Sequence, residues 1–214
     1  MNLQIKRFVN DLMASNSYCI LDNETKHAII VDPGSEKSSQ EIEYIENNDF
    51  IVDYIILTHE HTDHTWGVNS LIRRFSHAKV VCSNACKIEL PNASSAYFRY
   101  YYDDSNYTYS VLRVDYTIDI LNGVLKWGNN EITFYLTPGH SKGSMCFRID
   151  NNLFTGDTVM PYPPFFNGRG SCKDLWKCSI MFLINSCSRD CIIYPGHGEL
   201  LSFSDWIKLN KELL

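Results

Sequence analysis

The sequence contains no apolar run long enough to span a bilayer, and its first residues lack the continuous apolar stretch of a secretion signal. We therefore expect no membrane partner and a cytoplasmic location. An excess of basic residues is also missing, because 19 Lys and Arg stand against 25 Asp and Glu, for a formal net charge of -6. An acidic chain repels phosphate backbones, so nucleic acid is not the expected partner.

Linkers and repeats are absent as well. No stretch rich in Pro, Gly or Ser divides the chain, and no short-period repeat or low-complexity tract occurs. A length of 214 residues is enough to bury a substantial core, so we expect a single domain over residues 1–214.

The eight cysteines lie mostly inside apolar runs, where a free cysteine behaves as a small hydrophobe, and we expect them to be reduced and structural.

Both halves of the chain follow one order: several strands, then a helix, then a short apolar strand of the kind that is buried on both faces. This order predicts sheets that are covered by helices. The expected strands are residues 3–9, 17–22, 27–31, 53–58, 78–82, 116–121, 123–127, 131–137, 144–149, 153–155 and 191–194, and the expected helices are residues 37–47, 65–75, 174–186 and 203–213.

A tyrosine-rich insertion interrupts this order at about residues 91–115. It contains Tyr97, Tyr100 and several further aromatics among Asp, Ser and Asn residues. Two interpretations stay open: a lid of aromatic surface over a site, or an exposed insertion that packs on its own aromatic side chains.

Histidines gather where the expected strands end. Three of the seven histidines lie within six residues, at His59, His61 and His64, directly after a buried strand. His140 and His197 each follow a Pro-Gly pair at the end of another strand, and Asp157 follows a strand and a glycine. Ligands at strand ends point to one rim of a sheet, where α/β proteins place their sites.

Imidazole nitrogen and carboxylate oxygen suit zinc, iron and manganese. His59 and His61 are two residues apart and can face the same way along an extended loop, while Asp63 and His64 turn away from them. That arrangement can serve two ions side by side, with Asp157 able to bridge them through its two oxygens. For His27 and His77 we expect an ordinary core or surface role.

The ordered motifs Thr-His-x-His-x-Asp-His from Thr58, Pro-Gly-His at His140, Thr-Gly-Asp-Thr from Thr155 and Pro-Gly-His-Gly from Pro195 resemble those of the metallo-β-lactamase superfamily. Within that superfamily, these motifs are similar in particular to those of the glyoxalase II-like hydrolases (hydroxyacylglutathione hydrolases). Together with Ser15–Tyr18 and Val31–Gly34, the resemblance extends to Glu199. It implies an α/β (α+β) fold, a four-layer αβ/βα sandwich with two mixed sheets flanked by helices and the metals at one edge.

The resemblance also implies a role for each of seven residues. It gives one metal to His59, His61 and His140, gives the other to Asp63, His64 and His197, and makes Asp157 the bridge. We accordingly expect a binuclear centre of two divalent ions, most simply zinc, with iron or manganese as the alternatives. Asp63 and Asp157 are the expected catalytic carboxylates.

The expected activity is metal-dependent hydrolysis, in which a metal-bridging hydroxide attacks a thioester or ester of a small molecule. A thiolate leaves without a proton, so a thioester needs no strong general acid. The alternatives are a mononuclear iron persulfide dioxygenase, and a lactonase or phosphodiesterase on the same fold.

Three residues are candidates for binding the substrate: Tyr100 in the insertion, Tyr162 in the Pro-rich loop after Asp157, and Arg169 at the end of that loop. Arg169 has the chemistry to bind a carboxylate. Glyoxalase II enzymes often carry a C-terminal helical domain with basic residues for glutathione. Few residues follow His197 here, including Lys208 and Lys211, and this departure makes glutathione thioesters a less secure expectation.

Overall fold

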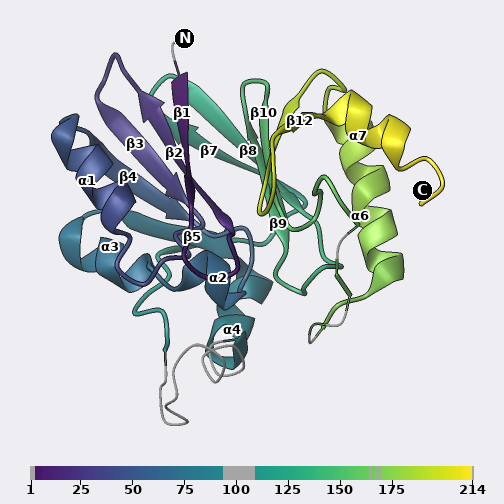
Figure 1. The fold of residues 1–214 in the computed structure, drawn as a ribbon, viewed down its shortest axis with the longest axis horizontal. Coiled ribbons are helices and arrows are strands. Elements are labelled where there is room, and N and C mark those ends of the chain that lie inside the picture. The colour runs from purple at the N-terminus through teal and green to yellow at the C-terminus, as the bar shows by residue number, and fades with distance from the viewer. Residues whose placement is uncertain (1–2, 94–108, 164, 167, 169, 214) are drawn as a thin grey trace.

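The computed structural model describes residues 3–93, 109–163, 165–166, 168 and 170–213. Two six-stranded sheets form its centre, in the orders β1-β2-β3-β4-β5-β6 and β12-β11-β10-β9-β8-β7 (Figure 1). The strands of the first sheet are β1 Leu3–Val9, β2 Asn16–Asp22, β3 His27–Val31, β4 Ile51–Ile56, β5 Lys79–Ser83 and β6 Tyr116–Ile118. Those of the second are β7 Asn122–Trp127, β8 Asn130–Leu136, β9 Met145–Ile149, β10 Asn152–Gly156, β11 Ile192–Pro195 and β12 Leu201–Ser202.

Helices cover the outer face of each sheet (Figure 1). Those of the first half are α1 Ser39–Asn47, α3 Val68–Arg74 and α4 Asn84–Ala93, and those of the second half are α6 Lys173–Ser186 and α7 Phe203–Leu209. The short helix α2 Thr62–Thr65 follows the loop after β4. The result is a four-layer αβ/βα sandwich with two mixed sheets, as the sequence predicts.

Successive side chains along the strands point to opposite faces of the sheet, and this alternation fills the layers of the sandwich. On β2, Cys19 and Leu21 face the layer of α1, α3 and α4, whereas Tyr18 and Ile20 face the second sheet. The second sheet places Phe134 and other aromatic residues between the two sheets. Its opposite face packs on α6 and α7. Strands that are buried on both faces in this way read as continuous apolar runs in the sequence.

Several expectations about local structure are wrong in detail. The helix expected over residues 65–75 begins only at Val68, as α3, and the separate short helix α2 precedes it. The strand expected over 116–121 ends at Ile118, and the helix expected over 203–213 ends at Leu209. Helix α4 and strand β12 have no counterpart among the expected elements.

Of the tyrosine-rich insertion, residues 94–108 lie outside the described part of the chain, so the two interpretations of it stay open. Tyr109 is described: it is buried with Leu12 and Trp66, and its hydroxyl donates a hydrogen bond to the Thr65 carbonyl. The expectation of one domain over residues 1–214 stays a prediction.

The fold gathers the ends of several strands at one edge. β4 runs parallel to β3 and β5 in the first sheet, and β10 runs parallel to β11 in the second. β8 and β10 are both antiparallel to β9, so β8 has the direction of β10. The loops after β8, β10 and β11 therefore leave the second sheet at one edge.

Candidate metal centre

The loops at this edge carry all seven residues for which the motifs predict metal binding. His59, His61, Asp63 and His64 come from the loop after β4 and from α2, and His140, Asp157 and His197 come after β8, β10 and β11. All but His61 and His197 are classed as buried, and those two are partly buried. The structure thus brings together side chains that lie up to 138 positions apart in the sequence (197 − 59).

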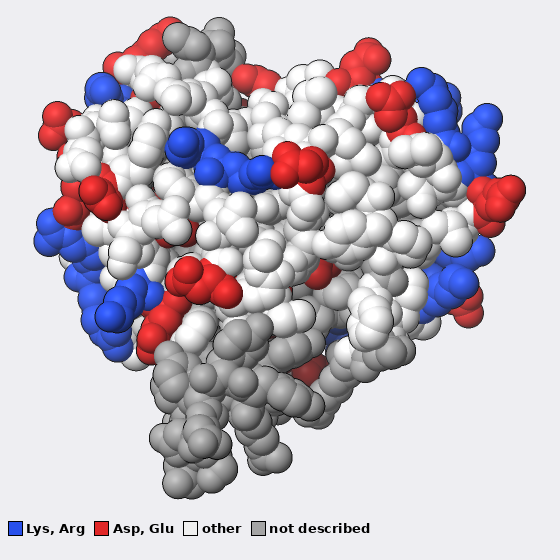
Figure 2. Space-filling view, viewed as in Figure 1, with Lys and Arg blue, Asp and Glu red and all other residues white. Residues whose placement is uncertain are grey.

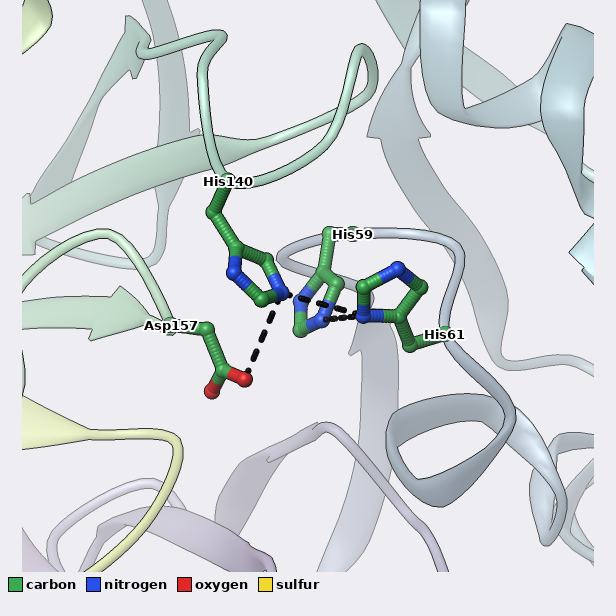
Figure 3. A group of neighbouring side chains, drawn as sticks. All are labelled: His59, His61, His140 and Asp157. Atoms are coloured by element: carbon green, nitrogen blue, oxygen red, sulfur yellow. Dashed lines mark hydrogen bonds and ion pairs between the residues drawn. The ribbon is translucent and has the colours of Figure 1, made fainter. Parts of the chain in front are cut away.

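His59, His61, His140 and Asp157 point toward one another and form a first group (Figure 3). His61 Nδ1 lies 3.1 Å from His59 Nε2 and 3.0 Å from His140 Nε2. The Asp157 Oδ2 atom lies 3.4 Å from His140 Nε2. Four donor atoms around a tetrahedral ion, each at about 2.0–2.2 Å from it, are separated by about 3.3–3.6 Å. The distances of 3.0–3.4 Å within this group are slightly shorter than that spacing.

Asp63, His64 and His197 form a second group beside the first. The Asp63 Oδ2 atom lies 3.2 Å from His197 Nε2 and 3.4 Å from His64 Nε2, and the two histidine nitrogens are 3.4 Å apart. This triangle of two imidazoles and one carboxylate is a second set of donors with the spacing of metal ligands.

Asp157 lies between the two groups. Its Oδ2 atom is 3.4 Å from His140 Nε2 and 3.6 Å from His197 Nε2, and its Oδ1 atom is 3.5 Å from His64 Nε2. Oδ1 is buried and takes part in no hydrogen bond. A buried carboxylate oxygen without a donor is costly, and a cation between the groups would remove that cost.

The electrostatics of the cluster also fit a cation. Burial lowers the pKa of His59, His61 and His140, and neighbouring imidazoles lower it further, so these rings are neutral and keep a free lone pair. Burial alone would raise the pKa of Asp63, but His64 and His197 hold it well below its usual range. Neutral imidazoles are the form that binds metals, so the first group is ready for a cation. Despite burial, Asp63 and Asp157 raise the pKa of His64, which would release its proton on binding a metal.

Asp32 contacts the second group directly and the first group through Thr58. Its Oδ2 atom accepts a hydrogen bond of 2.6 Å from the Thr58 hydroxyl and lies 3.0 Å from Nδ1 of His64. The Thr58 hydroxyl also lies 3.0 Å from Nδ1 of His59. A carboxylate behind a ligating histidine fixes the ring orientation and its tautomer. Sequence reasoning assigned no role to Asp32 or Thr58, although Asp32 follows β3 and Thr58 follows β4.

A second contact connects the histidine loops. Glu60 is buried between His59 and His61, and its Oε2 atom accepts a hydrogen bond of 2.9 Å from the Ser141 hydroxyl. Ser141 directly follows His140, so this bond holds the loop after β4 and the loop after β8 against each other. Sequence reasoning missed this pair too, because nothing local indicates that the two residues meet.

A cavity of about 530 Å³ opens onto both groups. Its remaining walls are largely apolar, with Met13, Met160, Tyr162, Pro163 and Phe165. Tyr162 therefore lies where a substrate-binding residue is expected. Tyr100 and Arg169, the other two candidates, lie outside the described residues.

His27 and His77 lie apart from this cluster. His27 Nδ1 is 2.7 Å from Asp53 Oδ2 near the opposite ends of the strands, and both histidines line a separate surface cavity there.

The metallo-beta-lactamase superfamily model matches residues 10–214. The chain belongs to this superfamily. Among described residues no helix has both the length and the apolar character needed to cross a membrane.

Curated relatives and a solved structure agree with this assignment. A hydroxyacylglutathione hydrolase of Hydrogenovibrio crunogenus is 29% identical over 81% of this chain and 54% of its own length. The "Probable polyketide biosynthesis zinc-dependent hydrolase BaeB" of Bacillus velezensis is 30% identical over 91% of this chain and 77% of its own length. The crystal structure of the BLEG-1 B3 metallo-beta-lactamase superposes with a TM-score of 0.84 at 23% identity, covering 98% of this chain and 99% of that one.

The expected resemblance and fold are thus confirmed. The chain spans about half the length of the first hydroxyacylglutathione hydrolases that it matches.

Proposed function

We propose that this chain is a metal-dependent hydrolase that cleaves a thioester bond in a small molecule. The observation that carries the proposal is the position of Asp157, whose two oxygens face two separate groups of histidines. Relatives named as a hydroxyacylglutathione hydrolase, a zinc-dependent hydrolase and a thioesterase support the same class of reaction.

The donor set fits two divalent ions, and we propose zinc for both. His59, His61 and His140 would hold one ion and Asp63, His64 and His197 the other, with Asp157 shared between them. Ions bound in this way lower the pKa of water to about 7 and polarise a carbonyl oxygen.

The chain's own carboxylates set the protonation around the reacting groups. The pKa of Asp63 lies well below its usual range despite burial, so its carboxylate stays ionised next to the cavity. In that state it can bind metal at Oδ2, where His64 and His197 converge, and orient or accept a proton at its other oxygen. No hydrogen-bond donor contacts Asp157 Oδ1, so this oxygen is available to a cation.

The cavity favours an apolar acyl group. Met13, Met160, Tyr162 and Phe165 present thioether and ring surface beside the metal donors. No lysine or arginine is among the described residues that line it. Glutathione carries carboxylates, and the described wall offers them no basic side chain. We therefore propose a thioester with an apolar acyl chain on a thiol other than glutathione.

The decisive experiment measures metal and substrate on the same preparation. Metal content of the purified protein is determined by mass spectrometry, and turnover is then followed on thioesters, a lactone and a phosphodiester. Two thioesters share one apolar acyl chain, one on glutathione and one on an uncharged thiol. We expect two equivalents of zinc and faster cleavage of the uncharged thioester. Metal-replete protein that cleaves none of the panel would refute the proposal.

A second candidate is an iron-dependent persulfide dioxygenase. The observation in its favour is that the three imidazoles and one carboxylate of the first group could by themselves hold a single ion, and such donors also suit iron. The second group of Asp63, His64 and His197 would then have no metal to hold. Oxygen uptake with a glutathione persulfide, by protein that contains one iron, is the result that would favour this candidate.

The expected partner is accordingly a small-molecule substrate. On the face that Figure 2 presents, acidic and basic side chains are interspersed over the described residues, which suits neither a phosphate backbone nor an acidic membrane surface. The cytoplasmic location stays a prediction from the sequence.

A further inference from the structure

The chain at the beginning of β2 contacts two of the three residues in the second group of metal donors. Ser15 forms an isolated antiparallel bridge with His197, and its hydroxyl donates a hydrogen bond to the Asp63 carbonyl. Ser15 and the next residue, Asn16, are almost fully buried. The motif Ser15–Tyr18 thus has a place beside the metal donors, although the proposed hydrolysis gives it no role.

Asn16 holds the turn that carries His197 through three hydrogen bonds. Its backbone N–H donates to the Gly196 carbonyl at 2.6 Å. Its side-chain amide donates to the Pro195 carbonyl at 3.0 Å and to the Gly198 carbonyl at 2.9 Å. An amide nitrogen has two N–H donors, and this arrangement directs them to carbonyls on both sides of His197.

Arg7 on β1 reaches the same turn from the edge of the first sheet. Its Nη1 atom donates to the Gly198 carbonyl at 3.0 Å, and its Nη2 atom lies 2.9 Å from Glu199 Oε1. Gly198 has a φ of 79°, in the left-handed region that glycine adopts without strain. Two side chains of the first sheet therefore bind the carbonyl of the residue after His197, which itself follows a strand of the second sheet.

These contacts fix the backbone from which the His197 side chain extends. A ligand must be held within about 0.5 Å of its productive position, and the residues around it supply that restraint. Asn16 and Arg7 supply it for His197, and the Ser15 hydroxyl supplies it for Asp63. Partners of this kind change the affinity for a metal without binding it.

The donors of the first group come from other parts of the chain. His59 and His61 lie in the loop after β4, His140 lies in the loop after β8, and Asp157 lies on the turn after β10. A change in the turn of His197 should therefore act on the second group and leave the first group nearly intact.

We propose that Asn16 and Arg7 are positioning residues for the ion at Asp63, His64 and His197. They hold the turn of His197 in place and so set the affinity for that ion. This inference rests on the proposed function, because it assumes a centre of two ions. The effect of the two residues should appear at one ion and not at both.

The test measures both zinc affinities of the full chain. Metal-free protein is titrated with zinc by calorimetry in the presence of a competing chelator, which gives two constants. His197→Ala removes a donor of the second group and so identifies the constant that belongs to its ion. We expect Asn16→Ala to weaken that constant by about 10–100-fold and to leave the other nearly unchanged.

Asn151→Ala is the matched control. The Asn151 side-chain amide donates to the Asp190 carbonyl at 2.8 Å, where β10 and β11 begin, and the metal donors follow the opposite ends of these strands. The substitution is the same and it also removes a bond between loops, so both zinc constants should match those of wild type.

A merely structural role for Asn16 would lower the melting temperature of the metal-free protein and weaken both constants together. That result, two unchanged constants, or a wild type that binds one equivalent of zinc would overturn the proposal. If Asn16→Ala fails to fold, Arg7→Gln replaces it, because the Arg7 side chain is partly exposed. It should weaken the same constant by about threefold, and an unchanged constant would then refute the proposal.

Failure of the hydrolase proposal is a separate result. It is read from the turnover of protein that holds both ions, whereas the role of Asn16 and Arg7 is read from the zinc constants alone.

Discussion

The Asp32 Oδ2 atom lies 3.0 Å from Nδ1 of His64, and both side chains are almost fully buried. Asp32 adopts a left-handed backbone conformation with φ of 47°, directly after β3. Its carboxylate also accepts hydrogen bonds from the backbone N–H and the hydroxyl of Thr58. One residue that does not line the cavity thus orients His64 directly and His59 through Thr58.

Asp32→Asn should therefore weaken metal binding without removing a ligand. The amide can present a proton where the carboxylate accepted one, so we expect zinc affinity to fall by about 10–100-fold. Competition with a chromophoric chelator measures the affinity. Asp53→Asn is the matched control, because Asp53 holds His27 at a distance from the metal donors. Equal affinities in the two variants would contradict this role of Asp32.

Asp157→Ala tests the shared ligand directly. Loss of the carboxylate between the two groups should abolish metal-dependent turnover, by at least about 100-fold, and reduce the bound metal to one equivalent or less. Circular dichroism should still report a folded protein, because Asp157 lies on a turn after β10 and belongs to none of the apolar core clusters. Full activity in a folded variant would exclude the bridging position that we propose.

Ser141→Ala examines the contact that joins two ligand loops. Removing the hydroxyl leaves the buried Glu60 Oε2 without its donor, which should lower the free energy of unfolding by about 1–3 kcal/mol. Urea denaturation of metal-loaded protein measures the change. Ser76→Ala, at an exposed position, should stay within about 0.5 kcal/mol of wild type. A loss no larger than that of the control would show that the Glu60 contact contributes nothing.

Tyr162→Ala probes the wall of the metal cleft. Tyr162 is 48% exposed and lines the cavity without belonging to either donor group. Its loss should raise KM for the apolar thioester several-fold while kcat stays within about twofold, because contacts with a remote acyl chain act on both ground state and transition state. Steady-state kinetics separate the two constants. A fall in kcat with unchanged KM would place Tyr162 at the reacting atoms instead.

Much of the candidate site is predictable because its residues occupy strand ends, and strand ends are visible in the sequence. His140 and His197 each follow an apolar strand and a Pro-Gly pair, so their arrival at one rim follows from the strand order. The contact of Asp32 with His64 is different, since it joins positions 32 residues apart through a buried carboxylate. Local patterns carry no signal for that kind of pairing.

Two errors in the helices have local causes that only the packing reveals. The Gly67 backbone N–H donates a hydrogen bond to the Pro33 carbonyl and not to a helical carbonyl, and this bond separates α2 from α3 although the apolar pattern continues across it. Helix α4 contains Pro91 in its last turn and has little separation of polar and apolar faces, so its residues do not stand out as helical.

The pH dependence of stability offers a test of the burial of Glu41. Burial raises the pKa of Glu41, so the folded protein binds that proton more tightly than the unfolded chain. The stability that Glu41 contributes is complete below the ordinary pKa of a glutamate, and it is lost as pH rises through the raised folded value. Glu41→Gln removes this titration.

We therefore expect the melting temperature of Glu41→Gln, relative to wild type, to increase as pH rises from about 4 to about 7. Glu43→Gln on the same helix controls for the change of charge, and subtracting its profile isolates the effect of burial. Calorimetry at several pH values gives the three profiles. If the Glu41→Gln and Glu43→Gln profiles run parallel, burial does not raise the pKa of Glu41 in solution, and the prediction is wrong.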